Sequence, residues 1–178
     1  MRYLLFSAVL ISGFAACNQS VKGKNGVSYK SAVQYNDYIV GRQTILMKNI
    51  IAFGEMAQPK PDSAKKMLDV YAKETINFIK EIKGMPPYKG DSSLRDAAIN
   101  SFTFYKRVFE DDYKQILQIN ENMTEEGSVE VKKIVEDLGK EEEKFDKAFH
   151  NAQKGFADKN NMKLMENKMQ KEVDKLNN

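Results

Sequence analysis

Hydrophobic residues recur at helical spacing along most of the chain, and no useful stretch alternates with the period of a strand. The clearest pattern runs from about Ser63 to Lys83. One face of this segment carries Ala64, Leu68, Tyr71, Thr75, Phe78 and Ile82. Their intervals alternate between four and three residues, which predicts a helix packed along one side. Gly84 and the pair Pro86-Pro87 predict its end, since glycine and proline stop helices.

Three further segments show the same periodicity. The first runs from about Tyr29 to Met56, with Ile39, Leu46, Ile50 and Phe53 on one face. The next runs from Asp91 or Ser92 to about Asn120, with Leu94, Ala98, Tyr105, Phe109 and Ile116 on one face and Phe102, Val108 and Leu117 widening it. The last begins with a possible cap at Ser128 and carries Val131, Val135, Leu138, Glu142, Phe145, Phe149, Ala152 and Phe156.

These segments predict an all-α fold. Proline-rich or polar connections of roughly 6 to 9 residues separate the four helices, a length suited to antiparallel neighbours. We therefore predict an antiparallel four-helix bundle over residues 29–160. Residues 161–178 carry Leu164, Met165, Met169, Val173 and Leu176 and predict a short C-terminal helical extension that packs on the bundle, binds a partner or frays.

The region before the bundle has the layout of a secretory signal peptide over residues 1–16. Arg2 precedes an uncharged apolar run from Tyr3 to Phe14, and the small residues Ala15 and Ala16 follow. This run is shorter than the roughly 20 apolar residues of a transmembrane helix. Residues 17–28 are polar and contain Gly23 and Gly26, which predicts a flexible tether.

Phe14-Ala15-Ala16-Cys17 resembles the lipobox of bacterial lipoproteins, in which two small residues precede a cysteine. That resemblance implies cleavage before Cys17 and attachment of diacylglycerol to its sulfur. Because Asn18 is not aspartate and no acidic cluster follows Cys17, it further implies the outer membrane, with the protein facing the periplasm. Cys17 is the only cysteine, so lipidation would leave neither a free thiol nor a possible disulfide.

Composition excludes several chemistries. The formal net charge is +3 and 30% of the residues are charged with mixed sign, which argues against a nucleic-acid binder. His150 is the sole histidine and lacks a partner at the Glu-x-x-His spacing of di-iron bundles. One cysteine excludes thiolate zinc sites and haem attachment. No nucleophile motif is present, so we predict no cofactor, no metal and no catalytic activity.

Two clusters of aromatic and amide side chains stand out. Tyr35, Asn36, Asp37 and Tyr38 lie near the start of the first helix, and Gln153 and Phe156 lie near the end of the fourth. These ends are adjacent in an antiparallel bundle, so the six residues form either a structural closure of the bundle or a patch for a ligand or partner. The segments Y-N-D-Y-I-V (35–40) and A-Q-K-G-F-A-D-K-N-N (152–161) resemble helical envelope lipoproteins of Gram-negative bacteria. That group is of uncharacterised function, so the resemblance assigns no activity.

The sequence thus favours a lipid-anchored protein of the cell envelope. It would attach to the membrane through Cys17 and act through contacts with an envelope protein or through structural support. The alternative is a module that holds a small or lipid-like ligand between its helices, since 18 aromatic residues and nine methionines supply bulky surface.

Overall fold

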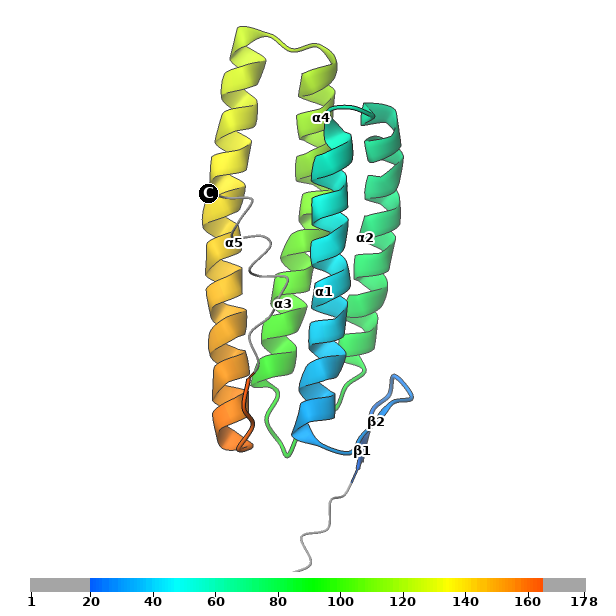
Figure 1. Ribbon diagram of the computed structural model, residues 1–178, viewed down its shortest axis with the longest axis vertical. Helices are drawn as coiled ribbons and strands as arrows, with labels where there is room; N and C mark the ends of the chain where they lie inside the picture. The colour runs from blue at the N-terminus through cyan, green and yellow to red at the C-terminus, as the bar shows by residue number, and fades with distance from the viewer. Residues whose placement is uncertain (1–19, 165–178) are drawn as a thin grey trace, which may run out of the picture.

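Four helical rods run antiparallel in the computed structural model, which describes residues 20–164 (Figure 1). The first rod is α1 (Ala32–Ala57) and the second is α2 (Pro61–Lys83). The third consists of α3 (Ser93–Arg107), a π-helical turn η1 (Val108–Asp112) and α4 (Tyr113–Glu121), and the fourth is α5 (Glu125–Lys159). The predicted all-α helical bundle is confirmed.

Helix starts differ from the prediction because local caps decide them. Helix α1 begins at Ala32, after the Ser31 side chain accepts a hydrogen bond from the Gln34 backbone nitrogen. Helix α2 begins at Pro61, since proline tolerates the first helical position, where its missing N–H has no partner. Thr124 caps α5 in place of Ser128, and its hydroxyl accepts from the Gly127 backbone nitrogen.

The third rod contains a feature that the sequence pattern did not predict. A π-helical turn holds one more residue than an α-helical turn, so the face that points into the bundle shifts by one position beyond η1. Leu117 is therefore 2% exposed, whereas Ile116 is only half-buried. The ring of Tyr113 stacks on Phe53 of α1 with centroids 4.3 Å apart.

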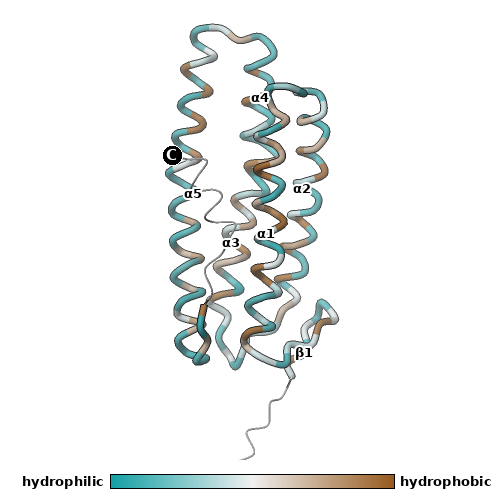
Figure 2. Tube along the Cα trace, in the orientation of Figure 1, coloured by the Kyte–Doolittle hydropathy of each residue, from teal (hydrophilic) through white to brown (hydrophobic). Residues whose placement is uncertain are grey.

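The core lies between α1, α2 and the third rod. All six predicted residues of α2 are buried, with Ala64, Leu68, Thr75 and Ile82 at 0% exposure. From α1 the core receives Tyr35, Ile39, Leu46 and Phe53, and from the third rod Leu94, Ala98, Phe102, Phe104, Tyr105, Val108, Phe109 and Leu117. Figure 2 shows hydrophobic residues concentrated on these rods.

Helix α5 contributes less to the core than its pattern predicted. Only Phe149, Phe156 and Ala157 are buried on it, and Val135 is 54% exposed. The helix packs against α3 and α4, so neighbours cover one edge of its hydrophobic face. Figure 2 accordingly shows α5 as mainly hydrophilic.

A short hairpin precedes the bundle, and the interpretation of residues 17–28 as a flexible tether is wrong for residues 20–28. Strand β1 (Val21–Lys22) pairs antiparallel with β2 (Ser28–Tyr29). Gly26 has φ 81°, a left-handed conformation that glycine adopts readily, and it lies in the connecting turn. The hairpin lies beside the lower ends of α1 and α2 (Figure 1).

Several predictions fall outside the described residues. These are the signal peptide over 1–16, Cys17 and positions 165–178 of the C-terminal extension. Residues 161–164 follow α5 without helical structure, and the Met162 backbone nitrogen donates to the Ala157 carbonyl at 2.9 Å. None of the helices between residues 20 and 164 combines the length and apolarity that a membrane span requires.

Two isoleucines of α2 test where the core lies. Ile82→Ala should lower the free energy of unfolding by about 2–5 kcal/mol, because it leaves a cavity at a fully buried position. The matched control Ile76→Ala, on the same helix and 41% exposed, should change it by less than about 1 kcal/mol. Urea denaturation measures both, and equal losses would contradict the described packing.

Candidate functional site

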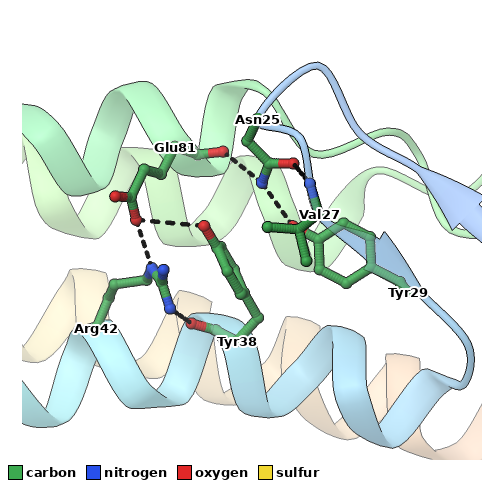
Figure 3. Close-up of polar contacts among 6 residues, drawn as sticks. All are labelled: Asn25, Val27, Tyr29, Tyr38, Arg42 and Glu81. Carbon is green, nitrogen blue, oxygen red and sulfur yellow. Dashed lines mark hydrogen bonds and ion pairs between the residues drawn. The ribbon is translucent and has the colours of Figure 1, made fainter.

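The hairpin is fastened to the bundle by a group of polar contacts that we call the latch, formed by Asn25, Tyr29, Tyr38, Arg42 and Glu81 (Figure 3). These residues come from the hairpin, α1 and α2. Their contacts form a continuous series, from Asn25 through both tyrosines and Arg42 to Glu81 and back to Asn25.

Asn25 makes the contacts that join the hairpin to α2. Its Nδ2 donates to the Tyr29 hydroxyl at 2.6 Å and to the Glu81 backbone carbonyl at 3.1 Å. Its Oδ1 accepts from the Val27 backbone nitrogen at 3.1 Å. Both amide hydrogens and the amide oxygen are therefore used, so a substitution at this position removes three hydrogen bonds.

The other half of the latch joins α1 to α2. Arg42 Nε donates to a carboxylate oxygen of Glu81 at 2.8 Å, and the Tyr38 hydroxyl donates to the same oxygen at 3.3 Å. The Arg42 guanidinium also lies 3.3 Å from the centroid of the Tyr38 ring, as in a cation–π contact. Burial raises the pKa of Tyr38, so its phenol stays protonated at neutral pH.

Two glycines let the hairpin approach the end of α2. A Cβ atom at Gly84 would lie 2.8 Å from the backbone nitrogen of Asn25, and one at Gly23 would lie 2.8 Å from the Gly84 carbonyl oxygen. The Asn25 backbone nitrogen donates to that carbonyl at 3.4 Å. Any side chain at Gly23 or Gly84 would therefore push the hairpin away from the end of α2.

Four residues of the predicted patch meet at the lower end of the bundle. Gln153 Nε2 of α5 donates to Asn36 Oδ1 of α1 at 2.9 Å, and the rings of Tyr35 and Phe156 stack with centroids 5.5 Å apart. The Tyr35 hydroxyl donates to the Pro86 carbonyl at 2.8 Å. Tyr35 and Phe156 are each 1% exposed. These contacts close the bundle end.

The remaining two patch residues, Tyr38 and Asp37, are not part of this buried closure. Tyr38 belongs to the latch and faces Glu81. Asp37 is exposed, and its Oδ1 accepts from Asn36 Nδ2 at 3.2 Å. The six residues therefore do not form one surface, and the four that meet are satisfied by contacts within the protein.

A second polar group lies where α5 packs along the third rod, and Glu142 and Asp146 in it are half-buried. The Tyr105 hydroxyl donates to Glu142 Oε1 at 2.8 Å, and Tyr105 is 3% exposed. Burial, followed by the neighbouring charge of Glu142, raises the pKa of Asp146 to about 6. Burial also raises the pKa of Tyr113 to about 12. An ionised Asp146 is thus unfavourable in the folded protein.

The π-helical turn lies next to this group. Arg107 Nη2 donates to Glu141 of α5 at 2.6 Å, and its Nε lies 3.7 Å from Asp112 Oδ2, a buried atom with no hydrogen-bond partner in the described part of the chain. Burial raises the pKa of Asp112, and Arg107 opposes that effect. Arg107 therefore ties η1 to α5.

The described residues offer no set of side chains suited to bind a metal ion. Within residues 20–164, no group of three or more His, Cys, Asp or Glu side chains is placed to hold a metal ion. His150 is exposed on α5, one position after the buried Phe149. No family model, curated protein or solved structure matches this chain.

Sequence reasoning missed the latch and the interior polar group. The motif Asn25-Gly26 is a recognised hairpin turn signal, but its flanking strands are two residues each, too short for an alternating pattern. Tyr105 and Glu142 were both assigned to hydrophobic helix faces. Glu142 is a charged residue on a hydrophobic face and needs a hydrogen-bond donor there, which could have indicated a partner such as Tyr105.

The latch can be tested through Asn25. Asn25→Ala should lower the free energy of opening the hairpin by about 1–3 kcal/mol, because three partly buried hydrogen bonds are lost. Hydrogen exchange of the Gly23 amide, which donates to the Val27 carbonyl, should accelerate accordingly. Asn77→Ala, at an exposed position of α2, is the control and should leave that exchange rate unchanged. Unaltered exchange in Asn25→Ala would contradict the latch.

The raised pKa of Asp146 leads us to predict that the stability of the fold increases as the pH falls below 7. Because its pKa of about 6 exceeds the usual value of about 3.9, the folded chain binds more protons than the unfolded chain between these values. The free energy of unfolding contributed by this group therefore rises as pH falls from 7 to about 4.

Asp146→Asn should remove this dependence and stabilise the protein at pH 7 by about 1–2 kcal/mol, allowing for partial solvent screening. Urea denaturation at several pH values from about 4 to about 7 measures the effect, since this range includes both pKa values of the group. Asp137→Asn, at an exposed carboxylate on the same helix, should keep the wild-type slope. A wild-type slope in Asp146→Asn would refute the assignment.

Proposed function

We propose that this protein is a lipid-anchored helical bundle of the cell envelope. Cys17 carries the lipid, and the bundle faces the periplasm from the outer membrane. It works through contacts with an envelope protein or through structural support, without catalysis. The lipobox-like segment supports the anchor, and the latch is the structural observation that favours a supporting role.

Because the latch holds the hairpin to the bundle, an anchor at Cys17 would also position the bundle relative to the membrane. Val21, where β1 begins, lies four positions after Cys17, so the distance between the two residues is at most about 13 Å at roughly 3.3 Å per residue. The hairpin is held to α1 and α2 by the contacts of Asn25, Tyr38 and Arg42. A lipid on Cys17 would therefore keep the lower end of the bundle close to the bilayer.

The acyl chains would supply the membrane affinity. Each buried methylene contributes about 0.8 kcal/mol, and stable anchoring takes two chains or one chain with a second signal. Diacylglycerol on Cys17 supplies two chains, so no spanning helix is required.

Exposed hydrophobic residues at the opposite end support a role in protein contacts. Val129 and Val135 of α5 are 67% and 54% exposed, and Met123 in the preceding loop is 51% exposed. In Figure 1 this region lies at the end of the bundle away from the hairpin. A partner in the periplasm would reach it without displacing the anchor.

We place ligand binding between the helices second. The interior polar groups that could orient a ligand, Tyr105 and Glu142, are already bonded to each other. Stacking of Phe53 on Tyr113 and of Phe104 on Phe145 fills the neighbouring space with side chains.

Removal of the lipidation site tests the proposal. Cys17→Ala should move the protein from the membrane fraction to the soluble fraction or leave its signal uncut, because neither lipid attachment nor the coupled cleavage is then possible. Mass spectrometry of the wild-type membrane fraction should show a chain that begins at Cys17 and carries acyl groups. Ser20→Ala is the control and should stay in the membrane. An unmodified Cys17 in the wild-type membrane fraction would reject the anchor, and so would a Cys17→Ala chain that is cut and still stays with the membrane.

A further inference from the structure

We propose that the hairpin end of the bundle contacts anionic lipid headgroups and thereby holds the bundle end-on to the membrane. This inference rests on the proposed lipid anchor at Cys17. It adds a second contact between protein and bilayer, made by a surface that we call the basic end. The basic end consists of Lys22, Lys24 and Lys30 of the hairpin region together with Lys83 and Lys89.

The hairpin contributes only positive charge. Residues 20–30 contain three lysines and no acidic residue, and all three lysines are exposed. Lys83 ends α2 and Lys89 lies in the loop to α3, and both are also exposed. Because of the antiparallel topology, these segments lie at the same end of the bundle as the hairpin (Figure 1).

Acidic residues at this end are largely matched by other groups of the protein. Three of them pair with basic side chains at 2.6–2.9 Å: Asp91 with Lys159, Glu81 with Arg42, and Asp96 with Arg95. Hydrogen bonds from Lys159 and Ser93 hold the pKa of Asp91 well below its usual range. Asp37 and Asp158 are exposed and offset only part of the lysine charge.

The five lysines of the basic end have no acidic partner within 4 Å among residues 20–164. They are therefore available to a negatively charged surface outside the protein. Lysine side chains suit lipid headgroups, since their long stems let the ammonium group reach the interface.

The opposite end has the reverse charge. Residues 120–136, around the start of α5, contain five glutamates and two lysines, and the α1–α2 connection at the same end, residues 55–66, adds two acidic residues and three lysines. Acidic side chains therefore outnumber basic ones there by seven to five. An anionic bilayer would attract the hairpin end and repel this one. The two ends are separated by the length of α5, whose 35 residues span about 52 Å.

The position of the anchor favours lipid over an acidic protein as the partner. Lys22 lies five residues after Cys17 and belongs to a strand that is latched to the bundle. A lipid on Cys17 would hold this lysine at most about 17 Å from the lipidated residue at roughly 3.3 Å per residue. The tether therefore lets the lysine reach the layer of about 10 Å at 0.1 M salt in which the attraction of the headgroups acts. No acidic protein is placed so close by the chain itself.

Energy transfer from two labelled positions tests the proposed orientation. Lipidated protein is reconstituted into phosphatidylcholine vesicles with or without phosphatidylglycerol, together with an acceptor on the lipid headgroups. The donor is attached through Ser93→Cys at the basic end or Ser128→Cys at the far end, both at exposed positions. Thioether-linked Cys17 would not react with the label, so each variant carries one donor.

Transfer should be stronger from position 93 than from position 128 in vesicles with phosphatidylglycerol. The difference should shrink in vesicles without it, and also in about 1 M salt, where the Debye length is about 3 Å. Lys22→Glu, Lys24→Glu and Lys30→Glu together should abolish the effect of phosphatidylglycerol. The matched control reverses three exposed lysines of the far end, Lys66, Lys132 and Lys133, and should keep the difference.

Equal transfer from both positions in anionic vesicles would overturn the end-on contact. A transfer efficiency that changes neither with phosphatidylglycerol nor with reversal of the hairpin lysines would also overturn it. If the hairpin triple variant instead lost crosslinks to an envelope protein in cells while its vesicle orientation stayed unchanged, the basic end would bind protein and not lipid. Failure of the wild type to float with either kind of vesicle would reject the anchor itself, which is a different outcome.

Discussion

The structure depends on the burial of one face of α2 between α1 and the third rod. Ala64, Leu68 and Ile82 on that face are completely buried, and burial of a large aliphatic side chain contributes about 1.5–3 kcal/mol. Because α2 contacts both α1 and α3, its face sets the position of both neighbours. Helix α5 packs on α3 and α4 and buries fewer residues, so a mostly hydrophilic sequence suffices for it.

The end of α2 also explains where the hairpin lies. The last carbonyl groups of a helix have no partner in a following turn and must find one elsewhere. Asn25 adds donors at this helix end, from its side chain to the Glu81 carbonyl, which also accepts from the Gly84 backbone nitrogen, and from its backbone to the carbonyl of the capping residue Gly84. The glycines at positions 23 and 84 permit that approach, and the Arg42–Glu81 ion pair holds α1 to the same turn. Completion of a helix end thus fixes the segment that would connect the bundle to a membrane.

Among the described residues, a group of titratable side chains lies where α5 packs along the third rod. The Tyr105 hydroxyl donates a hydrogen bond to Glu142. Burial and the charge of Glu142 disfavour the ionised form of Asp146. The neighbouring π-helical turn brings Arg107 to Glu141 and shifts the inward face so that Tyr113 and Leu117 reach the core. The lower end of the bundle is instead closed by Tyr35 and Phe156, with the Asn36–Gln153 hydrogen bond beside them.

The sequence alone determined the helical bundle, the buried face of α2 and the end of that helix at Gly84, because these features follow from periodicity and from residues adjacent in the chain. It also indicated that Asn36 and Gln153 would be neighbours, since an antiparallel topology brings their helix ends together. Only the tertiary structure decided the latch, the shifted face beyond η1 and the partial burial of Asp146. Each of these depends on partners distant in sequence: Asn25 bonds to Glu81, 56 residues away, and Tyr105 bonds to Glu142, 37 residues away. A local pattern holds no information about such partners, so a segment of small polar residues was expected to be flexible although it has a defined place.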